Sequence, residues 1–146
     1  MVAGEGYVIG FDFGLKHLGI AVGQTVTGTA SGLSTLKARN GKPNWSEIDE
    51  LLVQYRPIAI VVGLPLNMDG SDSHISQRAS TFAQRIARHA HLPTYLADER
   101  LSSWAAKDDD MLTGDIHARS ACLIAETFLN DFSVCLPVKT KLHHPT

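Results

Sequence analysis

The stretch YVIGFDFGLKHLGIAVGQT, residues 7–25, decides the fold class of this chain. Its two apolar runs, residues 7–14 and 18–24, flank a short turn and predict an antiparallel pair of strands. Asp12 stands inside the first run, among residues that favour burial, and we expect it to be buried. A buried carboxylate is costly unless an opposite charge or hydrogen bonds compensate it. Asp12 therefore either holds a ligand or, with Gly14 two residues later, caps the turn through its own side chain.

The residues that follow predict an α/β fold. After a weaker third strand and the loop RNGKPN, strands and helices alternate, which indicates a mixed sheet of three antiparallel strands and then β–α alternation, with helices on its faces. We expect Asn44 and Ser73 to cap the first two helices. The predicted later elements are a strand at 30–38, a helix at 45–56, a strand at 58–65, a helix at 74–90, a strand at 93–102 and a helix at 116–132.

Length and composition fit one compact domain. The chain has 146 residues, of which 44% are hydrophobic, and a formal charge of −2 that neither favours nor excludes nucleic acid. We expect a single domain over residues 1–136 and a loose tail over residues 137–146. With two cysteines, no membrane-length apolar run and no signal-peptide pattern, the sequence predicts a cytoplasmic protein. Cys122 lies in an apolar helical pattern and is expected in the core.

A second acidic candidate lies in TYLADER, residues 94–100, which closes a predicted strand. Side chains alternate along a strand, so one of Asp98 and Glu99 faces the same side of the sheet as Asp12. Neighbouring carboxylates repel each other, and a divalent cation such as Mg²⁺ relieves that repulsion. Taken alone, however, the run of Asp98, Glu99 and Arg100 is more typical of a surface salt-bridge turn.

Three motifs in this order carry a resemblance: GFDFGLKHLGIAVGQ at 10–24, IVVGLPLNMDGS at 60–71 and DERLS at 98–102. Together they resemble the YqgF/RuvX family of small RNase H-like proteins, described as Holliday junction resolvases and as nucleases that mature pre-16S ribosomal RNA. The resemblance implies an RNase H-like fold and phosphodiester hydrolysis with Mg²⁺ or Mn²⁺ in a two-metal site. It also implies that Asp12 is the first catalytic carboxylate and Glu99 the second.

The chain departs from the family pattern at the third carboxylate, which the resemblance implies should open the last helix. His117 stands at that place, nine residues before Glu126, and Asp115 lies two residues earlier. Glu126 lies about 13 Å farther along a helix that rises 1.5 Å per residue, too far to substitute. We predict that His117 faces the metal site as ligand or general base and that Asp115 caps the helix. The sequence alone leaves open which of the two replaces the missing carboxylate.

Four basic residues are candidates for contact with nucleic acid. Lys16 follows Asp12 in the turn, Arg78 and Arg85 share one face of the helix at 74–90, and Arg100 follows Glu99. Such side chains bind phosphates, although each position also fits a solvated surface residue.

Two classes of function remain open, and length argues against a third. The first is a metal-dependent nuclease that processes the 5′ end of pre-16S rRNA, with a Holliday junction-like DNA endonuclease as its alternative. The second is a catalytically weak module that only binds nucleic acid, which the missing third Asp keeps open. Actin-like kinases also open on a D-x-G strand, but they need two such domains and 146 residues supply one. Expected partners are structured RNA or branched DNA, with the chain as a monomer or weak homodimer and no membrane.

Overall fold

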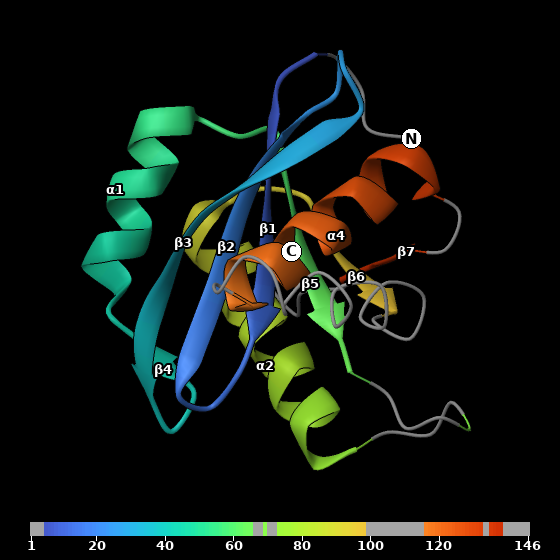
Figure 1. The fold of residues 1–146 in the computed structure, drawn as a ribbon. Coiled ribbons are helices and arrows are strands. Elements are labelled where there is room, and N and C mark those ends of the chain that lie inside the picture. Colours follow the sequence, from blue (N-terminus) through green and yellow to red (C-terminus); the bar gives the residue numbers. More distant parts are fainter. Residues whose placement is uncertain (1–4, 66–68, 70–72, 99–115, 133–134, 139–146) are drawn as a thin grey trace, which may run out of the picture.

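The computed structural model describes residues 5–65, 69, 73–98, 116–132 and 135–138. Within them a mixed sheet has the strand order β4-β3-β2-β1-β5-β6-β7, which confirms the predicted α/β class (Figure 1). The elements are β1 Tyr7–Phe13, β2 His17–Gln24, β3 Thr29–Arg39, β4 Lys42–Pro43, α1 Trp45–Tyr55, β5 Ala59–Leu64, α2 His74–Ala90, β6 Thr94–Asp98, α4 Ile116–Asn130 and β7 Cys135–Pro137. No helix in these residues is long and apolar enough to cross a membrane.

The predicted antiparallel start of the sheet is confirmed. β1 pairs with β2 and β2 with β3, all antiparallel, while β1 pairs in parallel with β5 and β5 with β6. The predicted loop RNGKPN is wrong in one respect, because Lys42 and Pro43 form β4 against the end of β3. Asn40 and Gly41 join the two strands with φ values of 51° and 79°. An Asn-Gly pair with positive φ suits a two-residue hairpin turn.

Side-chain oxygens begin α1 and α2 as predicted. The Asn44 side chain accepts a hydrogen bond of 3.0 Å from the backbone N–H of Ser46. The Ser73 hydroxyl accepts one of 2.9 Å from the N–H of Ser76, whose own hydroxyl accepts from the Ser73 N–H at 2.7 Å. This reciprocal capping box satisfies two backbone donors that a helix start otherwise leaves unpaired.

The sheet separates two apolar layers. Ile9, Phe11 and Phe13 of β1 pack on the side of α1 and α2, whereas Val8 packs with Phe128 of α4 on the other side. Figure 1 shows α4 crossing one face of the sheet while α1 and α2 lie against the other. Strand alternation therefore places Asp12 on the α4 face, together with Val8.

The C-terminal strand β7 was not predicted. Cys135 pairs antiparallel with Ala97 of β6, and the N–H of Val138 donates to the carbonyl of Thr94 at 2.8 Å. The expected boundary between residues 136 and 137 falls inside this strand. Residues 139–146 lie outside the described part, so the proposed loose tail stays a prediction.

Candidate active site

Asp12 lies one residue before the end of β1, opposite Gly19 of β2. Its neighbours Phe11 and Phe13 turn into the opposite core, which leaves the carboxylate on the α4 face. The sequence predicts a buried carboxylate, but the Asp12 side chain is only half-buried. The desolvation cost is correspondingly smaller than for an enclosed charge, and solvent reaches the group.

The start of α4 rests on the strand pair that carries Asp12. A Cβ added at Gly19 would collide with the carbonyl oxygen of His117, and one added at Gly10 would lie 2.9 Å from the carbonyl oxygen of Ala121. Only glycine allows a helix backbone to come so close to a strand. The structure therefore brings Asp12 and His117 to the same end of the same sheet face.

A second histidine, which sequence reasoning missed, contacts the first. The rings of His17 and His117 stack with their centroids 4.6 Å apart and their planes 16° apart. His17 stands two positions before Gly19 in β2, so the alternation of that strand could have indicated its side. The stack restricts the plane of the His117 imidazole, which is half-buried while His17 is exposed.

The structure decides the face of Asp98, the last residue of β6. Leu96 packs with the cluster on the side of α1 and α2, and Ala97 belongs to the cluster under α4. Asp98 therefore falls on the face opposite Asp12. Glu99, together with Arg100 and Asp115, lies outside the described residues. Within those residues no group of three His, Cys, Asp or Glu side chains is arranged to hold a metal ion.

Known proteins resemble this chain over most of its length. The RuvX family, described as Holliday junction resolvase, matches residues 6–131. This chain belongs to the RuvX family. A relative from Pseudomonas putida KT2440, described as "Putative pre-16S rRNA nuclease", is 50% identical over 107 residues, covering 73% of this chain and 76% of the relative. A relative of the same description from Glaesserella parasuis is 44% identical over 134 residues, covering 86% and 97%.

Solved structures support the fold. The RuvC protein of Thermus thermophilus in complex with a Holliday junction superposes with a TM-score of 0.58 at 18% identity, covering 90% of this chain and 99% of RuvC. A second structure of T. thermophilus RuvC gives a TM-score of 0.54 at 16% identity. The predicted RNase H-like fold is thereby confirmed, and the chain is a member of a nuclease family.

Three of the four basic candidates of this RuvX chain, Lys16, Arg78 and Arg85, lie in the described residues. Lys16 is exposed in the turn between β1 and β2, where its carbonyl accepts from the N–H of Ala38 at 2.8 Å. Arg78 and Arg85 share one face of α2 as predicted, and both line a hollow beside Phe13. That hollow lies on the side of the sheet away from Asp12, so the two arginines and the first carboxylate are separated by the sheet.

Two further polar side chains of α4, Glu126 and Cys122, bond to β3. The Glu126 carboxylate accepts from the N–H of Ala30 at 3.2 Å, and the Cys122 thiol donates to the carbonyl of Ala30 at 3.1 Å. Both contacts tie α4 to β3. Burial raises the pKa of Cys122, with the Glu126 charge adding to it, and burial raises that of Cys135 to about 11. Neither thiol is activated as a nucleophile.

Proposed function

We propose that this chain is a divalent-metal-dependent nuclease that processes the 5′ end of pre-16S rRNA in the bacterial cytoplasm. The observation that carries the proposal is the docking of the first turn of α4 on Gly19, directly opposite Asp12. This docking brings the half-buried Asp12 carboxylate and the His117 imidazole to the same end of one face of the sheet. The description of the relatives as pre-16S rRNA nucleases supports the choice of substrate.

The donor types present suit a divalent ion. The Asp12 carboxylate is a ligand that Mg²⁺ accepts, and the imidazole of His117 suits Mn²⁺ better. Because Asp98 belongs to the opposite face, Glu99 is our proposed second carboxylate. When bound, Mg²⁺ or Mn²⁺ would supply an activated water and neutralise charge on the phosphate oxygens.

The protein's own residues then have distinct roles. Asp12 and Glu99 would hold the ion, and one imidazole nitrogen of His117 would either ligate it or orient and deprotonate the attacking water. The stack of His17 on His117 fixes the ring plane in which that nitrogen lies. Arg100 would orient Glu99 or contact the substrate backbone, a role that stays a prediction.

A second substrate is favoured by a specific finding. The family description is Holliday junction resolvase, and the fold is that of RuvC. The same pair of carboxylates would cut a branched DNA by the same chemistry. The third possibility, a module that binds without cutting, follows from the imidazole at the place of the third carboxylate.

The deciding experiment compares cleavage of a ribosomal precursor RNA and of a four-way DNA junction, each with Mg²⁺ and with Mn²⁺. We expect metal-dependent cleavage of the RNA at its 5′ side and little cleavage of the junction. Asp12→Asn and Glu99→Gln should abolish it with the fold intact, whereas Glu50→Gln at an exposed position of α1 should not. Preferred cleavage of the junction would replace the proposed substrate, and an intact RNA with every metal would favour the binding module.

A further inference from the structure

A hollow of about 180 Å³ lies on the face of the sheet opposite Asp12. Aromatic rings form its floor: Trp45 stacks on Phe82 with centroids 5.9 Å apart and planes at 27°, and Phe13 packs on Phe82 at 5.5 Å. The Trp45 ring is half-buried, so part of the indole remains open to a ligand. Trp45 and Arg85 also line an adjoining recess of about 230 Å³, together with His89.

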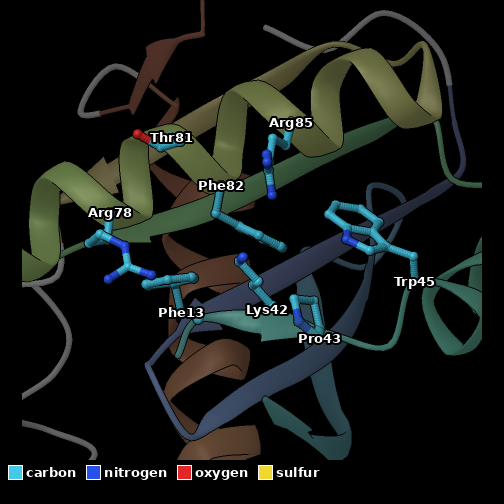
Figure 2. Close-up of a pocket in the computed structure, with 9 residues that line it drawn as sticks. Phe13, Lys42, Pro43, Trp45, Arg78, Thr81, Phe82 and Arg85 are labelled. Atoms are coloured by element: carbon cyan, nitrogen blue, oxygen red, sulfur yellow. The ribbon is translucent and has the colours of Figure 1, made fainter. Parts of the chain in front are cut away.

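Cations surround this floor. Lys42 of β4 and Arg78 and Arg85 of α2 line the hollow, and no carboxylate lies among its lining residues. Figure 2 shows the Lys42 and Arg85 side chains pointing toward one another across it. Arg78 donates from Nη2 to the carbonyl of Asn40 at 2.5 Å and is thereby held in place. Across the described residues, Lys42 and Arg85 have no hydrogen-bond or ion-pair partner.

The Asp49 carboxylate of α1 is already paired. The Asp49 carboxylate bonds to Nε2 of His89 at 2.5 Å, and the His89 ring packs on Trp45 with centroids 4.8 Å apart. The unpaired positive charge of Lys42 and Arg85 therefore faces an aromatic floor without local compensation. An aromatic platform beside cations binds single-stranded nucleic acid, because bases stack on the ring while phosphates meet the charges.

Size and position limit the ligand. A volume of about 180 Å³ is below the roughly 300–1,000 Å³ of pockets that enclose a small molecule. It suits one nucleotide of a longer strand that lies across it. Phe13, which lines the hollow, is the last residue of β1 and directly follows Asp12. A strand that passes round this end of the sheet meets Asp12 on one face and the hollow on the other.

We infer that the hollow is a second binding site, which holds a single-stranded RNA extension of the substrate by stacking a base on Trp45 and pairing its phosphate with Lys42 and Arg85. The site rests on the proposed function only for the identity of the substrate. Its binding is independent of the metal site, so the Asp12→Asn variant should retain it.

The test measures binding of a short oligouridylate to the uncut Asp12→Asn protein in the absence of divalent metal. Trp104→Phe is added, so that Trp45 is the remaining tryptophan and its emission reports directly on the floor of the hollow. We expect binding to quench that emission. Lys42→Ala with Arg85→Ala should weaken binding about tenfold or more and lower the salt slope by about 0.7, the value for one phosphate contact on a single strand. Trp45→Phe removes the fluorescent reporter, so its binding is measured with a fluorescently labelled oligouridylate; it should weaken binding less than the double charge substitution.

The matched control removes the same charge elsewhere. Arg56 at the end of α1 and Arg88 on α2 are exposed and do not line the hollow, so Arg56→Ala with Arg88→Ala should change binding by less than twofold. Equal losses in the two double variants, or an unquenched Trp45, would overturn the site. So would tighter capture of a four-way DNA junction or of inorganic phosphate than of the oligouridylate. If Asp12→Asn still cuts RNA while the hollow variants lose binding, the catalytic assignment fails and the hollow stands.

Discussion

Replacing Gly19 with alanine tests whether the first turn of α4 positions His117 over Asp12. The added Cβ would meet the carbonyl oxygen of His117, which is backbone and cannot swing aside. Overpacking of this kind costs about 1–3 kcal/mol, and the stiffer unfolded chain offsets about 0.4–1 kcal/mol of that. We expect a net loss of about 1–2 kcal/mol in the free energy of unfolding, with the helix start displaced from the strand pair.

The matched control is Gly23→Ala in the same strand. Its Cβ would lie 2.7 Å from Cδ1 of Leu129, the end of a flexible side chain that can move away. Urea denaturation with linear extrapolation measures both variants, and cleavage per folded molecule is measured where each is fully folded. Gly19→Ala should lower kcat several-fold, whereas Gly23→Ala should leave it near the parent rate. Equal stability and equal rates in the two variants would refute the docking of α4 as the cause of His117's position.

Three further predictions concern the site and its surroundings. His117→Ala should lower Mg²⁺-dependent cleavage several-fold, and His117→Asp should keep or raise it. Asp115→Ala should cost about 0.5–2 kcal/mol of stability and leave cleavage intact. Loss of cleavage in Asp115→Ala with a fully active His117→Ala would make Asp115 the residue of the metal site instead of His117. Lys16→Ala with Arg78→Ala should flatten the salt dependence of RNA affinity, and an unchanged slope would remove both from the substrate path. The free energy of unfolding should fall as pH rises from 9.0 to about 11, because the pKa of the Cys135 thiol is 9.0 in the unfolded chain and about 11 in the folded one. Urea titrations of Cys135→Ala should show a shallower fall. Identical pH profiles of the variant and the parent would contradict this prediction.

The elements predicted best are those with a local signal. The helix at 74–90 was predicted with the bounds that the structure has, because a cap and an apolar stripe of period 3.6 coincide there. The strands β4 and β7 were missed, since two or three residues carry no periodicity and each strand exists only through a distant partner. The Asn40-Gly41 pair was nevertheless a usable hairpin signal.

The candidate residues came from the sequence, but their arrangement did not. The D-x-G strand made Asp12 a candidate, and the family resemblance singled out His117; the catalytic roles of both stay predictions. The half-burial of Asp12 and the assignment of Asp98 to the other face depend on how α4 and the two core layers pack. No local pattern holds that information. The separation of Arg78 and Arg85 from Asp12 by the sheet likewise depends on how the two core layers pack.

The histidine at the third position is part of a packed pair. An imidazole at 117 stacks on His17 with planes 16° apart, and Gly19 two residues after His17 admits the helix turn that carries it. An aspartate at 117 would have no ring to stack and would leave one face of His17 open to solvent. The histidine that stands where the resemblance implies a third carboxylate therefore stacks on His17, and Gly19 leaves room for the helix backbone that carries it. This coupling is the physical reason to treat His17, Gly19 and His117 as one unit when the site is altered.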